Sequence, residues 1–192
     1  KPQEEYFMGE EEINRIFEQT YGANKRKDSK KTKKRIEKRV ISHGSAMRPK
    51  KSDEQYLLVD GYNIVFAWQE LSELAKDNID AARGRLMDIM CNYQGYKKCT
   101  LILVFDAYRV KGNVGQMIPY HNIHVVYTKE AETADQYIEK LAHKMGRDYH
   151  VTVATSDGLE QLIIRGQGCR LISAREFYEE VKQVEEEIRK QI

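Results

Sequence analysis

The sequence has little cysteine and no long apolar run, and both absences narrow the class of protein. It contains three cysteines among 192 residues, and no two of them have the CxxC spacing of a zinc or redox motif. Such a scattered set predicts free thiols in a reducing compartment, and therefore a cytoplasmic protein. No apolar stretch approaches the roughly 18 residues of a membrane span, and no signal-peptide pattern opens the chain. We therefore expect no membrane partner.

The sequence also lacks an evident catalytic or metal site built on histidine. The five histidines have no Ser-His-Asp arrangement that would predict a serine hydrolase. His121 and His124 have the spacing of a zinc pair on a helix, but IHVV predicts a strand, which disfavours a shared metal.

Basic residues concentrate in one segment near the N-terminus. Residues 24–51 hold 13 Lys and Arg against two acids, a net charge of +11, whereas the chain from Tyr56 onward is slightly acidic. A segment of this kind is suited to contact the phosphate backbone of nucleic acid. A solvated tether explains the same pattern equally well.

The first 55 residues are predicted to be a tail. Ile13, Ile16 and Phe17 share one face of a short amphipathic helix at 10–21. The basic segment that follows has almost no apolar content, which predicts a disordered or helical arm. Gly, Pro and Ser then mark a linker up to residue 55. The chain begins at Lys1 rather than Met, and we expect it to be an excerpt of a longer protein.

From Tyr56 to Ile192, apolar runs alternate with helical patterns. Strands are predicted at 56–60, 99–106, 123–128, 150–155 and 169–173, and helices at 80–93, 133–145 and 157–165 and from Ser173 onward. Buried strands alternating with helices predict a single α/β domain over 56–192, with a mostly parallel central sheet covered on both faces.

Three aspartates end predicted strands: Asp60 in LLVDGYN, Asp106 in LILVFDAY and Asp157 in VTVATSDG. In a parallel sheet the ligand site lies beyond the carboxyl ends of the strands. Each aspartate alone has an ordinary explanation as a turn or helix-cap residue. Three carboxylates at one edge repel each other, and a hard divalent cation relieves that repulsion. The pattern therefore predicts a site for Mg²⁺ or Mn²⁺.

A second acidic group surrounds the start of the predicted helix at 133–145. Asp135 lies in its first turn and Glu132 precedes it, and the segment follows a strand that ends at the same edge. We expect both to join the metal site, although acids are also favoured at helix N-termini for their own sake.

Several residues near this edge are candidate RNA contacts. Arg109 and Lys111 follow Asp106 on a Gly-containing loop, where they are suited to bind a phosphate. Thr155 and Ser156 are candidate hydrogen-bond donors to a phosphate or a metal-bound water. Aromatic rings stack on single-stranded bases, and the candidates for that role are Tyr62, Tyr108 and Trp68, although Trp68 is better explained as a core residue.

The motifs VDGYNI, VFDA, ETADQYIE and TSDGLEQ resemble the NYN branch of the PIN-like nucleases, and specifically its YacP type. The resemblance covers Tyr56–Ile192 and implies a PIN-like three-layer α/β/α fold and metal-dependent endoribonuclease activity. It assigns the catalytic, metal-binding positions to Asp60, Asp106, Asp135 and Asp157. It also places Asn63 beside the metal, where Asn63 is a further candidate RNA contact. It also implies an mRNA substrate and a ribosome-associated setting.

The N-terminal stretch EEYFMGEEEINRIFEQTYG resembles the C-terminal tail of elongation-factor-G-like or ribosome-protection GTPases, which implies fusion to a translational GTPase. The favoured function is thus an endoribonuclease. The alternatives are a catalytically silent module that binds RNA or the ribosome, and a phosphatase-like or response-regulator-like α/β domain.

Overall fold

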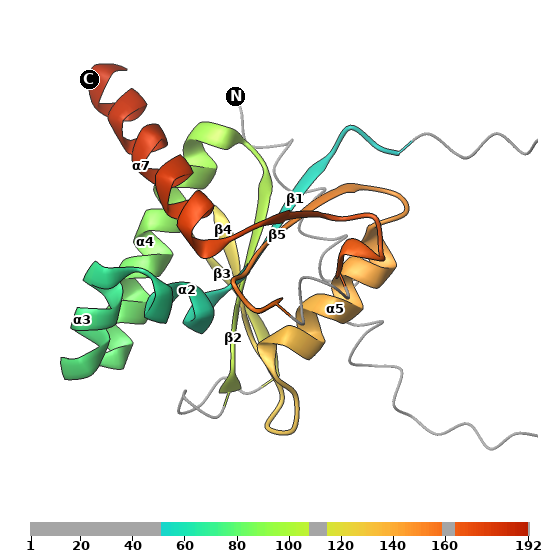
Figure 1. The fold of residues 1–192 in the computed structure, drawn as a ribbon, viewed down its shortest axis with the longest axis horizontal. Coiled ribbons are helices and arrows are strands. Elements are labelled where there is room, and N and C mark those ends of the chain that lie inside the picture. Colours follow the sequence, from blue (N-terminus) through green and yellow to red (C-terminus); the bar gives the residue numbers. More distant parts are fainter. Residues whose placement is uncertain (1–50, 108–114, 159–163, 192) are drawn as a thin grey trace, which may run out of the picture. The chain divides into compact units, whose positions relative to one another are not determined.

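The computed structural model describes residues 51–107, 115–158 and 164–191 (Figure 1). Residues 51–192 form one compact unit. The predicted helix at 10–21 and all but the last residue of the basic segment lie outside the described residues. No helix within the described ranges is long and apolar enough to cross a bilayer.

The described elements are β1 (Gln55–Asp60), α2 (Gly61–Ala67), α3 (Gln69–Asp77), α4 (Ile79–Lys97), β2 (Thr100–Phe105), β3 (Gln116–Tyr120), β4 (Ile123–Tyr127), α5 (Ala134–Met145), β5 (His150–Ala154), β6 (Arg170–Ile172) and α7 (Ala174–Gln191). The strands form one sheet in the order β3-β4-β2-β1-β5-β6. All neighbouring strands are parallel except β3 and β4. The predicted α/β fold with a mostly parallel sheet is confirmed.

Strand β3 is a structural feature that the sequence pattern does not predict. It pairs antiparallel with β4 at the edge of the described sheet, where the sequence indicates only a loop before IHVVYT. Its residues are exposed or half-buried, and it contains Pro119, which lacks a backbone donor. An edge strand of this kind has neither the continuous apolar run nor the regular alternation by which strands are identified.

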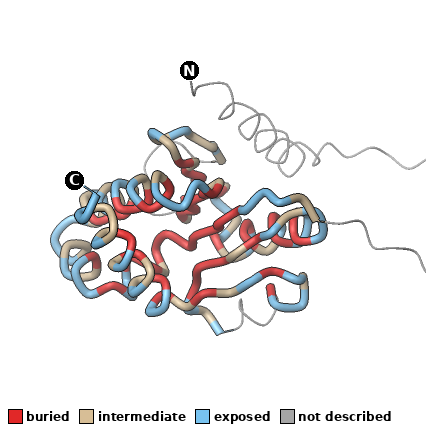
Figure 2. Tube along the Cα trace, turned by 90° about the horizontal axis from the view of Figure 1, so that it is seen from above, coloured by how far each residue is buried: buried red, intermediate tan, exposed pale blue. Residues whose placement is uncertain are grey.

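The two faces of the sheet are covered differently (Figures 1 and 2). Leu57 and Val59 of β1 belong to one core cluster that includes side chains of α2, α3, α4 and α7. Leu58, between them, points to the opposite face, which α5 covers, and it is fully buried as well. Burial on both faces explains why the central strands are apolar throughout rather than alternating.

Trp68 fixes the start of α7 against the break between α2 and α3. Its extended backbone ends α2, and its indole Nε1 donates a 2.7 Å hydrogen bond to the carbonyl oxygen of Ala174. The ring centroid lies 5.6 Å from that of Phe177 and 5.3 Å from that of Tyr178. Trp68 is only 3% exposed, which confirms its prediction as a core residue.

Capping boxes begin two of the described helices, α5 and α7. Thr133 and Gln136 exchange hydrogen bonds at the start of α5. Ser173 and Glu176 do the same at the start of α7, and the bonds from Ser173 lower the pKa of Glu176. These exchanges satisfy backbone donors that have no partner within the helix.

The three cysteines are free thiols, and we expect them to differ in reactivity. Cys99 and Cys169 are buried, whereas Cys91 is half-buried. Burial raises the pKa of Cys99 to about 11 and also raises the pKa of Cys91 and Cys169. Because the thiolate is the reactive form, iodoacetamide near neutral pH should modify Cys91 first. Mass spectrometry should find Cys99 and Cys169 modified only after denaturant is added; their modification in the native protein would contradict this packing.

Candidate active site

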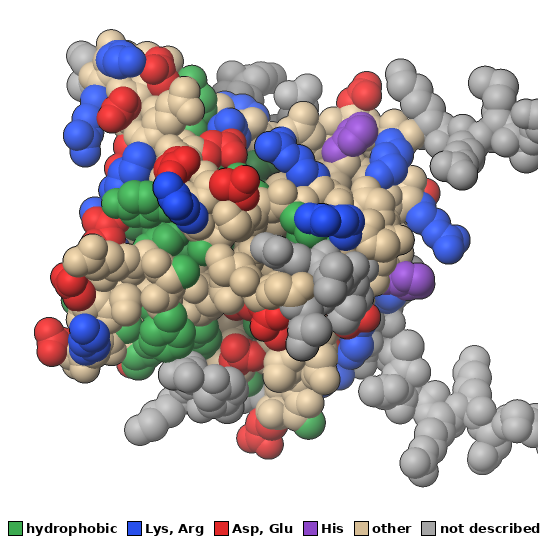
Figure 3. Space-filling model, in the orientation of Figure 1, with side chains coloured by type: hydrophobic (Ala, Val, Ile, Leu, Met, Phe, Trp, Pro, Cys, Tyr) green, Lys and Arg blue, Asp and Glu red, His purple; other side chains and the backbone are tan. Residues whose placement is uncertain are grey.

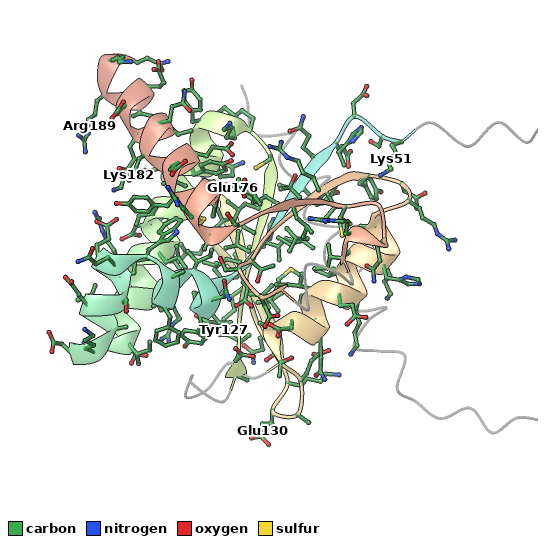
Figure 4. The ribbon with its side chains drawn as sticks, viewed as in Figure 1. Lys51, Tyr127, Glu130, Glu176, Lys182 and Arg189 are labelled. Atoms are coloured by element: carbon green, nitrogen blue, oxygen red, sulfur yellow. The ribbon has the colours of Figure 1, made fainter. Side chains whose placement is uncertain are left out.

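The candidate site lies at the carboxyl ends of β2, β1 and β5, three neighbouring strands at the centre of the sheet. From β1 the chain passes through β2 to β4 on one side and then returns to β5 on the other. The strand order therefore reverses between β1 and β5, the place where sheets of this class bind ligands. In Figure 4, Tyr127 and Glu130 mark this end, and Lys51 lies at the opposite end of the sheet.

The strand register places the three strand-end aspartates symmetrically. Asp60 pairs with Val104 of β2, and Val59 pairs with Ala154 of β5. Asp106 and Asp157 therefore both lie two residues beyond the level of Asp60, one on each side of β1. The predicted convergence of these three positions at one edge is confirmed at the level of the backbone.

Asp60 is a buried N-cap. The residue is only 4% exposed, and its Oδ1 accepts a 3.2 Å hydrogen bond from the backbone N–H of Asn63. Gly61 follows because there is no room for a side chain: a Cβ there would lie 2.3 Å from Cε1 of Phe105. The DG pair thus brings the end of β1 into close contact with the end of β2.

Asn63 joins the two strands at the reversal point. Its Oδ1 accepts a 2.9 Å hydrogen bond from the backbone N–H of Ser156, in the loop after β5. The Ser156 hydroxyl in turn accepts a 2.9 Å bond from the backbone N–H of Ala174, at the start of α7. This chain of bonds ties α2, the β5 loop and α7 together beside the candidate site.

Asp106 connects the sheet to α5. Its Oδ1 accepts a 2.7 Å hydrogen bond from the backbone N–H of Ala134, the residue before Asp135. The next residue, Ala107, donates from its backbone to Oγ1 of Thr128 at 3.1 Å. Thr128 is fully buried and organises this corner, although the sequence pattern does not single it out. The only sequence feature that points to Thr128 is its place as the polar residue at the end of the run IHVVYT.

Asp135 and Glu132 occupy different environments. Asp135 is half-buried in the first turn of α5 and follows the residue that bonds to Asp106, so the structure brings these two predicted ligands to one corner. Glu132 forms a 2.5 Å ion pair with Lys140 on α5. That pair gives Glu132 a structural partner, and its role as a metal ligand stays a prediction.

Thr155 and Asp157 form the loop after β5. Thr155 is fully buried, and its Oγ1 accepts a 3.2 Å hydrogen bond from the backbone N–H of Asp157. Thr155 therefore stabilises the conformation of the loop. Its direct contact with RNA stays a prediction. Ser156 is exposed beside it.

The remaining predicted RNA contacts divide into two groups. Arg109, Lys111 and Tyr108 lie outside the described residues. Tyr62 is described, and it is only 3% exposed, with its hydroxyl accepting a 3.2 Å hydrogen bond from Arg83. Its ring packs edge-on against Phe105, so the prediction that Tyr62 offers a stacking surface is wrong.

The donor chemistry of the site suits a hard cation. The four aspartates offer only oxygen atoms, which Mg²⁺ and Mn²⁺ prefer. Within the described ranges, however, no group of three or more His, Cys, Asp or Glu side chains is gathered closely enough to hold a metal ion. Asp60, Asp106 and Asp157 follow neighbouring strands at one edge of the sheet, and their role as metal ligands stays a prediction.

Comparisons with known proteins agree with this architecture. Residues 57–192 match the family model described as "YacP-like NYN domain". The chain is 43% identical over 137 residues to "Uncharacterized protein YacP" of Bacillus subtilis (strain 168), covering 71% of this chain and 80% of the relative. Two crystal structures of Rae1 (YacP) from Bacillus subtilis also match. The first is 43% identical, and the match covers 78% of that chain. The second, a point mutant, is 41% identical, and the match covers 80% of that chain. Both matches cover 71% of the present chain and have a TM-score of 0.62.

The contact between Gly61 and Phe105 gives a direct test of the site's packing. Gly61→Ala should destabilise the protein by about 1–3 kcal/mol, because the buried Phe105 ring must move. The matched control is Gly84→Ala, inside α4, where an added Cβ meets nothing within 4 Å; it should stabilise by about 0.5–1 kcal/mol. Urea unfolding measures both, and equal stability of the two variants would contradict the close approach of Gly61 to Phe105.

Proposed function

Because the chain belongs to the YacP-like NYN domain family, a family with a nuclease-type function, we propose that it is a divalent-metal-dependent endoribonuclease. Its proposed substrate is mRNA, and its proposed setting is the ribosome in the cytoplasm. One observation carries the proposal: Asp60, Asp106 and Asp157 lie at the ends of three adjacent central strands, at the point where the strand order reverses. An acidic edge of this kind repels RNA unless a cation is present.

The proposed ligands for Mg²⁺ or Mn²⁺ are Asp60, Asp106, Asp135 and Asp157, with Glu132 as a further candidate. When bound, the ion would activate a water molecule and stabilise charge on the transferring phosphoryl group. Asp60 contributes a buried carboxylate whose position is fixed by the Asn63 backbone.

Phosphate contacts are proposed for the flanking residues. Asn63 holds the Ser156 loop in place through its side chain, so the exposed Ser156 is available at the edge of the site. Arg109 and Lys111 follow Asp106 in the chain and would add positive charge beside the scissile phosphate. The proposed contribution of Asn63 is to keep the β5 loop at a fixed distance from Asp60.

The N-terminal tail is proposed to deliver the nuclease domain. Its basic segment is suited to bind RNA through phosphate neutralisation. Its first part resembles the tail of a translational GTPase, and fusion to such a protein would bring the domain to the ribosome.

A binding module without catalytic activity is the second candidate. It is favoured by the fact that the described carboxylates are not gathered around one point. Such a module would bind RNA or the ribosome equally well in EDTA and would cleave no RNA with any metal. The nuclease predicts the opposite, namely cleavage that EDTA abolishes and Mg²⁺ or Mn²⁺ restores.

Removing single carboxylates tests the catalytic assignment. Asp60→Asn and Asp157→Asn should each reduce the rate of RNA cleavage by about 100-fold or more, because an amide cannot replace the lost charge. The change preserves side-chain size, and Asn is also a good N-cap, so melting temperatures should stay close to that of the unmodified protein. The rate is measured on a fluorescently labelled RNA in Mg²⁺ and in Mn²⁺.

Asp77→Asn, at the exposed end of α3, is the matched control and should cleave normally. If both site variants cleave at the original rate while remaining folded, the assignment is wrong. Because cleavage is proposed to occur in a ribosomal setting, the assay is run with and without ribosomes.

Neutralising part of the basic segment tests its role. Replacing Lys30, Lys31, Lys33 and Lys34 with Gln should weaken RNA binding and flatten the dependence of log Kd on log salt, by about 0.7 for each phosphate that the segment no longer neutralises. Lys76→Gln, on the exposed surface of α3, should change neither value. An unchanged slope in the fourfold variant would identify the segment as a tether.

A further inference from the structure

A hollow of about 410 Å³ lies between the α2–α3 break and the start of α7. Its lining comes from the break (Ala67, Trp68 and Gln69), from α7 (Ala174, Arg175 and Tyr178) and from the loop after β5 (Ser156). In Figure 3, apolar side chains reach the surface between α7 and α3. Apart from Ser156 and Trp68, none of the residues considered from the sequence as RNA contacts belongs to this hollow.

Aromatic rings form much of the hollow. Trp68 lies deepest, since it is almost fully buried and its indole is fixed by the bond to Ala174. Tyr178 is half-buried and stands edge-on to the indole, with 5.3 Å between ring centroids. Because the half-buried Tyr178 ring packs against the fixed indole, a flat ligand that stacks on Tyr178 loses little of its binding free energy to ordering the protein.

The hollow is continuous with the candidate active site through one residue. Ser156 lines the hollow and directly precedes Asp157 in the chain. Its backbone N–H bonds to Asn63, and its hydroxyl bonds to Ala174. An RNA strand with one phosphate at the aspartates would therefore have a neighbouring nucleotide within reach of Tyr178, the ring that covers Trp68.

Arg175 supplies positive charge at the rim. It forms an ion pair with Glu179 at 3.4 Å, and these side chains are 90% and 65% exposed, so the pair contributes little and leaves the guanidinium able to turn toward a phosphate. Lys182 lies 5.2 Å from the centre of the Tyr178 ring and is itself paired with Glu70 and Glu185. Both cations are paired with glutamates, so the rings inside the hollow, and not its net charge, favour a nucleotide base over an acidic peptide.

We propose that this hollow binds one base of the RNA substrate, next to the nucleotide whose phosphate lies at the aspartates. The base would stack on Tyr178 above Trp68, with its phosphate near Arg175 and Ser156. This inference rests on the proposed nuclease function, and it adds a positioning site that fixes where along a single strand the cut falls. Stacking of this kind accepts any base, because every base has a π-face.

The chain provides its own reporter for this site, because Trp68 is its only tryptophan. The full chain carrying Asp60→Asn is titrated with a short oligoadenylate in Mg²⁺, so that binding is measured without cleavage. We expect a saturable change in Trp68 fluorescence. An oligonucleotide series with one abasic position should show about 10-fold weaker binding when the missing base is the one in the hollow.

Two variants of one residue provide the matched comparison. Tyr178→Phe keeps the ring and should bind oligoadenylate normally, whereas Tyr178→Leu keeps an apolar side chain without the ring and should bind about 10-fold more weakly. If Tyr178→Leu does not fold, the abasic series on the original Tyr178 chain still decides the question.

The outcomes separate the base site from the proposed catalytic function. Fluorescence anisotropy of a labelled oligonucleotide measures binding independently of Trp68. If the oligonucleotide binds while Trp68 emission is unchanged and no abasic position weakens binding, the base site is overturned. RNA cleavage is then a separate result. Failure of the oligonucleotide to bind at all would also overturn the base site. A Trp68 response and a sensitive abasic position, in a chain that cleaves no RNA with any metal, would support the base site and refute the nuclease.

Discussion

The burial of Asp60 at the end of the central strand is the constraint on which the rest of the site depends. A carboxylate removed from water is costly unless nearby donors compensate for its lost hydration. The chain meets this cost by starting α2 immediately after the aspartate, so that the Asn63 backbone donates to it. That tight turn requires Gly61 against Phe105, and it places the Asn63 side chain where it holds the β5 loop. The DGYN motif is therefore one structural unit, in which each of these residues depends on the position of its neighbours.

Much of the fold could be predicted from the sequence, because central parallel strands are buried on both faces. The runs around Leu58, Leu103 and Val153 are largely apolar, and they mark β1, β2 and β5 directly. The ends of those runs then locate Asp60, Asp106 and Asp157. Strand β3 could not be found in this way, since it is half-exposed and depends on β4 for its pairing.

The hydrogen bonds that organise the site could not be predicted from the sequence pattern, for a different reason. The Asn63–Ser156 bond joins residues 93 positions apart, and the Asp106–Ala134 bond joins residues 28 apart. Periodicity describes which face a residue occupies, but such bonds depend on loop conformation and on three-dimensional proximity. The same limit applies to Tyr62, whose position beside a functional motif suggested exposure while its ring in fact packs on Phe105. It applies as well to the hollow at Trp68, which exists only because α7 returns to the α2–α3 break.

The two edges of the described sheet limit what the backbone can pair with. Strand β3 contains Pro119, which has no N–H to offer, and β6 at the other edge has only three residues. Short or proline-containing edges resist the addition of a foreign strand. These two features of the described sheet disfavour aggregation through its edges and recognition of a partner by strand addition. For a partner that contacts the described part of the sheet, we expect side chains rather than edge-strand backbone to provide the recognition.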